Sequence, residues 1–393
     1  MSASLFQPRK IADLKASGDV EALARRLKRA KESKVQIEAA QALGELGSAQ
    51  AIGPLATAAH DANPRLAVVA IEALGKLQIP DALPTLGDIL QDQDVSRRSA
   101  AAEALGHSGQ ADALSPLIRA AEDTEPKVRR AAIEGLGRLR DAQATDTLLN
   151  ALNDPDGITR RNAAEALSHL GDQRAVAPLI AALGDEEREV RREAARALGR
   201  LDAKEAVEPL IAALQDEGKW VRRAAAVALG RLGSDQATGA LTTALRDPER
   251  DVCVSAAEAL SQLGSSGVDA LVGGLQDPGI EVRECILDIL ATHDSEPVTA
   301  GLIAALEDED PTVCRGAARA LGQIGASEAV EPLIALLNRS QPWVRVVVLE
   351  ALGQIGDPRA LDAVSGLSQN RDYQVRRAAQ EAAQKLGAPQ RAV

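Results

Sequence analysis

One motif returns along this chain at a fixed interval. The stretch from Val221 to Gly233, VRRAAAVALGRLG, recurs with small changes from one end to the other. With the residue at the Gly230 position as a marker, its equivalents follow at steps of 31 residues, apart from one step of 30: Gly44, Gly75, Gly106, Gly137, Ser168, Gly199, Gly230, Ser261, Ala291, Gly322, Gly353 and Gln384. A sustained period of this length indicates a solenoid, in which each repeat packs on its neighbours.

Each period contains the pattern of two helices. In the seventh repeat, apolar residues stand at i, i+3, i+4 and i+7 between Glu205 and Leu214, which predicts an amphipathic first helix. After a polar turn, Val221 to Leu232 forms a second helix whose alanines keep it thin, and Gly233 ends it. Only 1% of the residues are aromatic, which suits two-layer helix stacking better than a large globular core. We predict an all-α fold, a right-handed α-solenoid of about twelve 31-residue, two-helix repeats.

The period also predicts the domain organisation. Residues 1–18 do not fit it and are expected to cap the first repeat, residues 19–387 to form one continuous solenoid, and residues 388–393 to be a short tail. The ninth repeat is the most irregular, because Gly273 and Gly274 are expected to interrupt its first helix.

Charge and hydropathy narrow the classes of partner. The formal net charge is −12, whereas binding to nucleic acid or to an anionic membrane surface requires a basic surface. The chain has neither an apolar run of signal-peptide length at its start nor an 18-residue apolar segment. We therefore expect a protein partner, with no nucleic acid and no membrane, and the sequence leaves the oligomeric state open.

The three cysteines suggest a compartment. Cys253, Cys285 and Cys314 lie in three successive repeats, and Cys253 and Cys314, two repeats apart, are too distant to be bridged. Free thiols in a chain without an export signal predict a cytoplasmic protein. We expect the cysteines to be structural rather than ligand-attaching.

The repeat resembles a known family. The pattern AVEPLIAAL, a turn with aspartate, then VRRAAAVALGRLG is similar to the short HEAT-like repeats of the phycobilisome (bilin) lyases, and the likeness covers residues 19–387. In solenoids of this kind the second helices line the concave side. A hydroxylase of the same fold binds iron through His-Glu pairs. Here each histidine is followed by another residue, so we expect no metal, no cofactor and no catalytic residue: His60-Asp61, His107-Ser108, His169-Leu170 and His293-Asp294.

Two charged columns follow the period. An aspartate recurs in the turn between the helices, as in Asp154 and Asp247, and an arginine recurs eight residues before the marker, as in Arg160 and Arg222. In similar HEAT repeats such columns form a ladder of pairs between adjacent turns. We expect a surface ladder in which each exposed pair contributes about 0–1 kcal/mol, so that replacing Arg191 alone would cost less than about 1 kcal/mol.

The exposed side of the second helices carries the candidate site. At 100° per residue, the positions ten, seven and three before the marker and one after it lie opposite the apolar face. Arginines occupy these positions in repeats four to seven, and Glu134 and Glu165 offset part of their positive charge. Tryptophan and arginine are the residues most enriched in binding hot spots. Alternatively, nearby glutamates balance these arginines and all are merely solvated. The candidate protein-binding residues are Arg130, Arg161, Arg192, Trp220, Arg223, Arg231 and Trp343.

These observations favour a non-enzymatic scaffold that binds a partner protein or an acidic segment in its concave groove. The alternative, which the resemblance implies, is a lyase-like protein that assists attachment of a linear tetrapyrrole to an acceptor protein. In that case Arg192 and Arg223 would bind propionates and Trp220 would stack on a pyrrole. The sequence shows no phosphate-binding glycine loop, nucleophile elbow or Cys-x-x-Cys motif.

Overall fold

The structure, a computed structural model, describes residues 10–387. The expected tail at 388–393 and the first nine residues of the expected cap lie outside the described residues. Residues 10–387 contain helices and turns but no strand, which confirms the all-α solenoid. Their contacts fall into two compact units that divide between Leu201 and Asp202.

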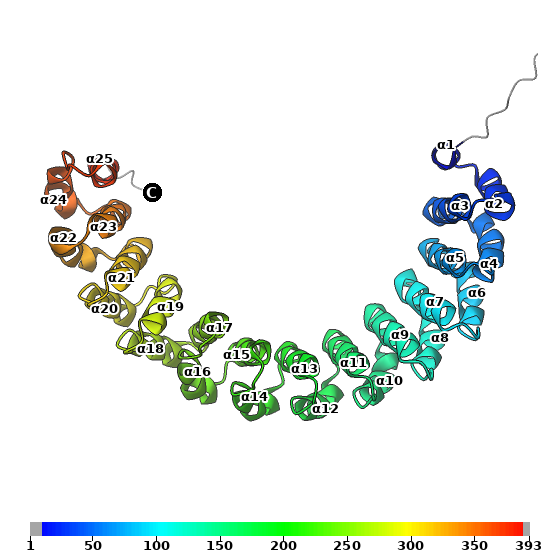
Figure 1. Cartoon of the computed structure of the whole chain (residues 1–393). Helices are drawn as coiled ribbons and strands as arrows, with labels where there is room; N and C mark the ends of the chain where they lie inside the picture. Colours follow the sequence, from blue (N-terminus) through cyan, green and yellow to red (C-terminus); the bar gives the residue numbers. More distant parts are fainter. Residues whose placement is uncertain (1–9, 388–393) are drawn as a thin grey trace, which may run out of the picture. The chain divides into compact units, whose positions relative to one another are not determined.

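The first unit begins with a short helix, α1 (Ile11–Ala16), which is followed along the chain by two layers of helices. Gly18, with φ of 66°, separates α1 from α2, as the Ser17-Gly18-Asp19 sequence suggests. The first-helix layer comprises α2 (Val20–Arg29), α4 (Ile52–Ala59), α6 (Leu83–Ile89), α8 (Leu114–Ala120), α10 (Thr145–Ala151) and α12 (Val176–Ala182). The second-helix layer comprises α3 (Ser33–Leu46), α5 (Pro64–Lys76), α7 (Val95–Ser108), α9 (Pro126–Leu139), α11 (Gly157–Leu170) and α13 (Arg188–Arg200). Figure 1 shows the second-helix layer on the inner side of the curve that this unit describes.

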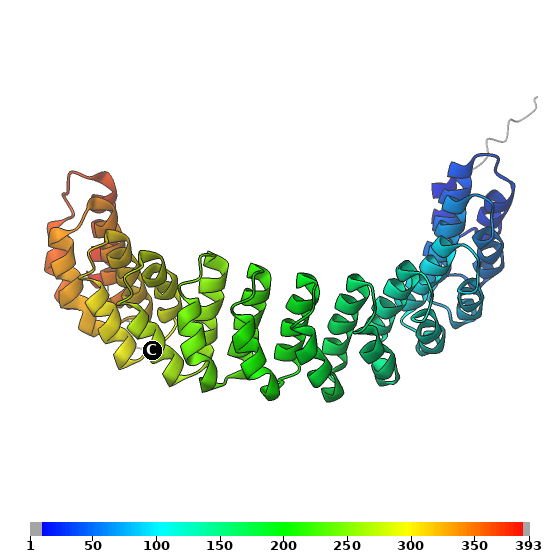
Figure 2. The same ribbon diagram turned by 60° about the horizontal axis from the view of Figure 1, so that its bottom comes forward.

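The second unit repeats this arrangement. Its first-helix layer comprises α14 (Val207–Ala213), α16 (Thr238–Ala244), α18 (Ser265–Gly274), α20 (Glu296–Ala305), α22 (Val330–Arg339) and α24 (Leu361–Gly366). Its second-helix layer comprises α15 (Lys219–Leu232), α17 (Arg250–Gln262), α19 (Ile280–Leu290), α21 (Pro311–Ile324), α23 (Pro342–Ile355) and α25 (Tyr373–Gly387). Within each unit, helices of successive repeats run side by side (Figure 2).

Most first helices begin with a short 3₁₀ turn rather than directly with an α-helix. The expected first helix from Glu205, for example, is a 3₁₀ turn at Lys204–Ala206 followed by α14. The other turns of this kind are Ala49–Ala51, Pro80–Ala82, Ala111–Ala113, Ala142–Ala144, Gln173–Ala175, Asp235–Ala237, Ser327–Ala329 and Pro358–Ala360. In the ninth repeat α18 instead starts at Ser265, and Gly273 and Gly274 form its last two residues. The expectation that this glycine pair interrupts the helix is wrong, because it lies where the helix already ends.

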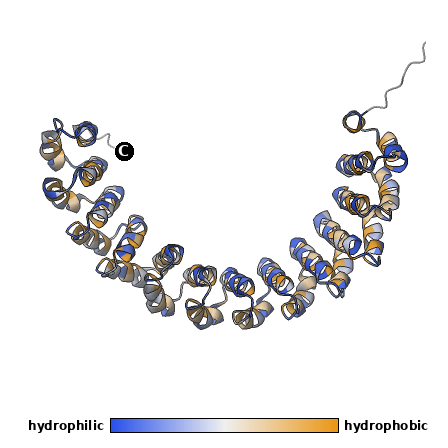
Figure 3. Cartoon of the chain, viewed as in Figure 1, coloured by the Kyte–Doolittle hydropathy of each residue, from blue (hydrophilic) through white to orange (hydrophobic). Residues whose placement is uncertain are grey.

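The core lies between the layers, where leucines recur at the period. Leu55, Leu117 and Leu210 of the first helices are fully buried, as are Leu43, Leu105 and Leu229 of the second helices. Polar residues instead follow the inner side of α7, α9 and α11 (Figure 3). Burial of these side chains supplies the main stabilisation, since each is worth roughly 1.5–3 kcal/mol.

The marker glycine permits close packing of neighbouring second helices. A Cβ on Gly75 would lie 2.8 Å from the Cβ of Ala104, and one on Gly106 would lie 2.5 Å from the Cα of Gly135. Real Cβ atoms do not approach other atoms this closely, so a larger residue at Gly75 or Gly106 would push the neighbouring helices apart, whereas Ser168, Ser261 and Ala291 stand at the marker in other repeats. The glycine, together with the alanines, therefore sets the spacing of the second-helix layer.

The two charged columns form the expected ladder. Arg98, Arg129, Arg160 and Arg222 each donate Nε and Nη2 to the aspartate of the next repeat, 25 residues on, and Nη1 to a carbonyl of their own turn. Arg283 donates Nη2 to Asp308 and Nη1 to the Asp277 carbonyl oxygen, while its Nε donates to no acceptor among the described residues. The same aspartate accepts a hydrogen bond from the backbone N–H two residues later, which closes its turn. The pairs, with N–O distances of 2.6–2.8 Å, are Arg98–Asp123, Arg129–Asp154, Arg160–Asp185, Arg222–Asp247 and Arg283–Asp308.

The ladder is buried, and our surface placement was wrong. The paired side chains are only 8–13% exposed, because the turns of successive repeats stack directly on one another and cover them. A buried pair of this kind destabilises the fold far more than an exposed one when one partner is removed. The ladder therefore fixes the register of the second helices, which carry the candidate site.

Where the columns break, other side chains take over. Cys314 replaces a ladder arginine, and its thiol donates to the Asp308 carbonyl oxygen at 3.2 Å, the kind of bond that arginine makes elsewhere. Arg339 replaces the aspartate that would face Cys314, and it reaches back to the Leu306 carbonyl oxygen at 2.8 Å. The connection between the two turns is thus preserved with the donor on the opposite side.

Two of the three cysteines are paired. Cys253 on α17 and Cys285 on α19 form a disulfide with a Cα–Cα distance of 6.7 Å, while Cys314 is free and buried. The expectation of three free thiols is therefore wrong, because adjacent second helices bring these two cysteines together. Our argument for a cytoplasmic location rested on free thiols and loses that support.

Candidate protein-binding surface

The candidate residues divide between the two units. Arg130 on α9, Arg161 on α11 and Arg192 on α13 lie in the second-helix layer of the first unit. The other candidates, Trp220, Arg223 and Arg231 on α15 and Trp343 on α23, lie in the same layer of the second unit. Each half is a surface of its own unit.

The three arginines of the first unit are in different states. Arg130 forms a fork with Asp156, donating Nε to Oδ2 at 2.8 Å and Nη2 to Oδ1. This guanidinium lowers the pKa of the Asp156 carboxyl, with help from the Thr159 hydroxyl and N–H. Arg130 is thus already neutralised within the chain, and a partner carboxylate would have to displace Asp156.

Arg161 and Arg192 make no ion pair among the described residues. Arg161 donates Nε and Nη2 to the amide oxygen of its neighbour Asn162, at 3.1 and 2.6 Å. The Nε of Arg192 is buried, and no hydrogen-bond acceptor in the described part of the chain reaches it. Neither guanidinium is neutralised by an ion pair, although Arg192 lies near the Glu189 carboxyl, whose pKa is lowered mainly by Arg188 and in part by Arg192.

The sequence did not single out two polar residues that organise this half. Glu193, only 2% exposed, holds Arg196 at 2.9 Å and lies 3.8 Å from Arg200. Arg200 also donates to the Ser168 hydroxyl at 3.0 Å, which links α13 to α11. Glu193 and Asn162 share the position six before the marker, where Ala100, Ala131, Ala224 and Ala378 stand elsewhere. A polar residue at a position that holds alanine in four other repeats was a signal, but a weak one, because Glu38 and Ser255 occupy the same position.

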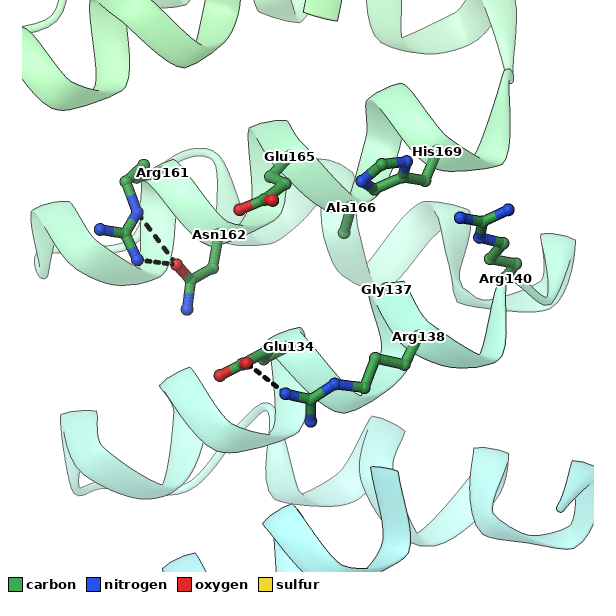
Figure 4. Close-up of a pocket in the computed structure, with 9 residues that line it drawn as sticks. All are labelled: Glu134, Gly137, Arg138, Arg140, Arg161, Asn162, Glu165, Ala166 and His169. Carbon is green, nitrogen blue, oxygen red and sulfur yellow. Dashed lines mark hydrogen bonds and ion pairs between the residues drawn. The ribbon is translucent and has the colours of Figure 1, made fainter. Parts of the chain in front are cut away.

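A pocket of about 470 Å³ lies between α9 and α11. Figure 4 shows Arg161 and Asn162 at one end and Arg140 and His169 at the other. Glu134 accepts a hydrogen bond from Arg138 at 2.5 Å along one wall, and Gly137 and Ala166 belong to the lining. The lining residues of this α9–α11 pocket are Glu134, Gly137, Arg138, Arg140, Arg161, Asn162, Glu165, Ala166 and His169.

An equivalent pocket lies two repeats earlier, between α5 and α7. Every residue of this α5–α7 pocket precedes its counterpart by 62 positions: Glu72, Gly75, Lys76, Gln78, Glu103, Ala104 and His107. His107 and His169, which each stand one residue after a marker, are thus related by the repeat, one in each pocket. Gln78 replaces Arg140, and no counterpart of Arg161 or Asn162 belongs to the lining.

The second unit presents two exposed tryptophans. Trp220 is 46% exposed, with the Lys219 ammonium 5.5 Å and the Arg223 guanidinium 5.7 Å from its ring centroid. Trp343 is 42% exposed, with the Arg315 guanidinium of the preceding repeat 5.2 Å from its ring centroid. Both tryptophans therefore combine an accessible ring with an adjacent cation, as expected of binding anchors.

The described residues contain no group of three His, Cys, Asp or Glu side chains arranged to hold a metal ion. Within residues 10–387, no helix is both long and apolar enough to cross a membrane. The surface of the second-helix layer instead offers arginines, two tryptophans and open pockets, which suit recognition of a ligand by contact.

The comparisons with known proteins agree with this architecture. The family model described as HEAT repeats matches residues 20–106, 54–125, 114–192, 176–261 and 299–384. A comparison of the sequence with curated proteins finds no match.

Solved structures share the fold. Kap121p bound to Pho4p matches with a TM-score of 0.67 and 14% identity over 98% of this chain and 52% of that chain. Kap95p, from its complex with RanGDP, matches with a TM-score of 0.62 and 12% identity over 98% of this chain and 65% of that chain. The CpcE–CpcF phycocyanin lyase complex of Nostoc sp. PCC7120 matches with 24% identity over 70% and 94% of the two chains, but its TM-score is only 0.38.

Proposed function

The chain belongs to the HEAT-repeat family, and from this premise we propose that it is a non-enzymatic scaffold that binds an extended segment of a partner protein along its second-helix layer. Kap121p, a protein of the same fold, has been solved bound to another protein, Pho4p. For this chain, the pair of exposed tryptophans in the second unit carries the proposal.

Trp220 and Trp343 occupy the same repeat position, four repeats apart. At roughly 10 Å per stacked helix pair, the two rings stand on the order of 40 Å apart along the stack. A small ligand cannot contact both. An extended peptide spans about 3.3 Å per residue, so a segment of about 12 residues or more would reach from one ring to the other.

The cations beside the rings favour an acidic segment. Lys219 and Arg223 flank Trp220, and Arg315 lies over Trp343, so an apolar side chain on either ring would bring its neighbours close to positive charge. In the first unit, Arg161 and Arg192 add cations without an ion-pair partner among the described residues. Arginine can bind carboxylates through two parallel hydrogen bonds, which gives such contacts direction.

The test begins with affinity capture by the full chain, followed by reconstitution with each purified partner. We expect Trp220→Ala together with Trp343→Ala to weaken binding of the true partner at least tenfold, with each single variant giving a smaller loss. Because these are the only two tryptophans in the chain, Trp220→Phe and Trp343→Phe leave one reporter each. Binding should shift the emission of both.

Tyr373→Ala is the matched control. Tyr373 is 65% exposed and has the Arg376 guanidinium 5.5 Å from its ring, but it lies outside the tryptophan column. This variant should bind the partner as the native chain does. If the double tryptophan variant binds every reconstituted partner with native affinity, the second-helix layer is not the binding surface.

A further inference from the structure

The α9–α11 pocket differs from its counterpart in charge. Its lining contains three arginines and two glutamates, a formal charge of +1 with His169 neutral. The α5–α7 pocket contains one lysine and two glutamates, a formal charge of −1 with His107 neutral. Seven lining positions are shared by the two pockets, so the repeat accounts for their common walls. It does not account for Arg140 and Arg161, the two additional arginines of the α9–α11 pocket.

Asn162 has a position that stacking does not require. Its side chain is nine-tenths buried at a position where alanine is sufficient in four other repeats, and its amide oxygen accepts both bonds from Arg161. Its amide nitrogen donates to none of the described residues and, in Figure 4, is turned toward α9. Asn162 therefore positions the Arg161 guanidinium at the pocket and presents a hydrogen-bond donor beside it.

Arg140 provides the positive charge at the other end, at a conformational cost. It has φ of 53° in the left-handed region, at the position where Gly47, Gly109 and Gly171 end other second helices of this unit. A residue with a Cβ costs roughly 1–2 kcal/mol more than glycine there. Arg140 makes no ion pair within the described residues and lies beside His169 in Figure 4.

We propose that the α9–α11 pocket binds two carboxylates of an acidic peptide, one at Arg161 and Asn162 and the other at Arg140 and His169. This inference rests on the proposed function, because it adds a contact point in the first unit for the partner's acidic segment. Charge complementarity selects this pocket over the α5–α7 pocket.

The length of the pocket selects a peptide rather than a small dicarboxylate. Arg161 and His169 are eight residues apart on α11, which corresponds to about 12 Å at 1.5 Å per residue. Acidic residues three or four positions apart in an extended peptide are separated by about 10–13 Å. The carboxylates of a short diacid such as glutarate cannot reach both ends together.

The experiment titrates hexaglutamate into the full-length, isotope-labelled chain and follows backbone amide signals by NMR. We expect shifts at Gly137 and Ala166, with binding at least tenfold tighter than at the equivalent Gly75 and Ala104. The two-charge difference supports this factor, because one charge pair at 4 Å in water is worth about 1 kcal/mol. Glutarate should bind at least tenfold more weakly than hexaglutamate, and hexaglutamine should produce no shifts.

A pair of glycine substitutions tests the role of Arg140 without risk of unfolding. Arg140→Gly removes the charge and relieves the left-handed backbone, so it should weaken hexaglutamate binding about fivefold to tenfold. Gln78→Gly gives the same backbone relief in the α5–α7 pocket and should leave binding unchanged. Asn162→Ala keeps every charge and should still weaken binding, because Arg161 is no longer held.

Three results would overturn the inference: equal shifts at the two pockets, no shifts at millimolar hexaglutamate, or equal affinity of the two glycine variants. Glutarate binding as tightly as hexaglutamate would instead assign the pocket to a free diacid, which also contradicts a peptide site. The proposed function is tested separately, because its tryptophan variants are measured against the partner protein and leave this pocket intact.

Discussion

Removing one arginine from the buried ladder should destabilise the first unit strongly. Arg160 donates to the Asp185 carboxylate through Nε and Nη2, both at 2.8 Å, and to the Asp154 carbonyl oxygen through Nη1 at 2.9 Å. The side chains of Arg160 and Asp185 are only 9% and 12% exposed. Arg160→Ala therefore removes two of the donors of the Asp185 carboxylate and the donor of the Asp154 carbonyl oxygen, in a place that water scarcely reaches.

The magnitude follows from these contacts. Removing one partner of a fully buried ion pair costs about 3–5 kcal/mol, and a single hydrogen bond to a charged group is worth about 1.5–3 kcal/mol. Asp185 keeps its bond from the Glu187 N–H, which offsets part of the loss. We expect Arg160→Ala to lower the free energy of unfolding by about 2–4 kcal/mol, and Arg160→Lys, which keeps the charge but loses the fork, by less.

The assay is urea unfolding followed by circular dichroism, with hydrogen exchange to locate the change. Exchange should accelerate in the turns at residues 152–157 and 183–188, which Arg160 joins, because solenoid repeats contact only their neighbours. The matched control is Arg174→Ala. Arg174 also pairs with two aspartates, but its side chain is 58% exposed, so the unfolding midpoint should not change measurably. If Arg160→Ala is as mild as Arg174→Ala, burial does not strengthen the ladder.

Three further predictions follow from the same structure. Burial opposes ionisation of the ladder aspartates, but the neighbouring arginines and turn N–H groups outweigh this effect and lower the pKa of these carboxyls. Thermal stability should therefore be constant from pH 7 to about 5 and fall below about pH 4, and a loss between pH 7 and 5 would contradict this. Alkylation of the denatured, unreduced chain should label Cys314 alone, whereas prior reduction should add Cys253 and Cys285, and three labels without reduction would exclude the disulfide. Gly106→Ala should destabilise the fold by about 1–3 kcal/mol, because the added Cβ would overlap the next helix. Gly53→Ala, whose Cβ would have no atom within 4 Å, should stabilise the fold by about 0.5–1 kcal/mol, and similar thermal shifts for both variants would refute the packing argument.

The sequence alone determined the repeating features of this protein. A period of 31 residues, a helical pattern of apolar residues and a glycine at each helix end are local properties, and they predicted the two-layer solenoid and the left-handed cap at Gly233. The two charged columns are also visible in the sequence, and the resemblance to HEAT repeats implied that they pair between adjacent turns, as Arg160 and Asp185 do. The same register placed Trp220 and Trp343 in the exposed second-helix layer.

Only the tertiary structure decided what surrounds each side chain. Burial of the ladder depends on how closely successive turns stack, and the Cys253–Cys285 pair depends on the distance between two helices that are adjacent in space but not in sequence. Whether an arginine on the inner side is free also depends on the next repeat, as Asp156 shows by neutralising Arg130 while Arg161 keeps its charge. Periodicity fixes the face of a helix on which a residue lies, but the electrostatic state of that residue is fixed by neighbours that stacking brings within hydrogen-bond distance.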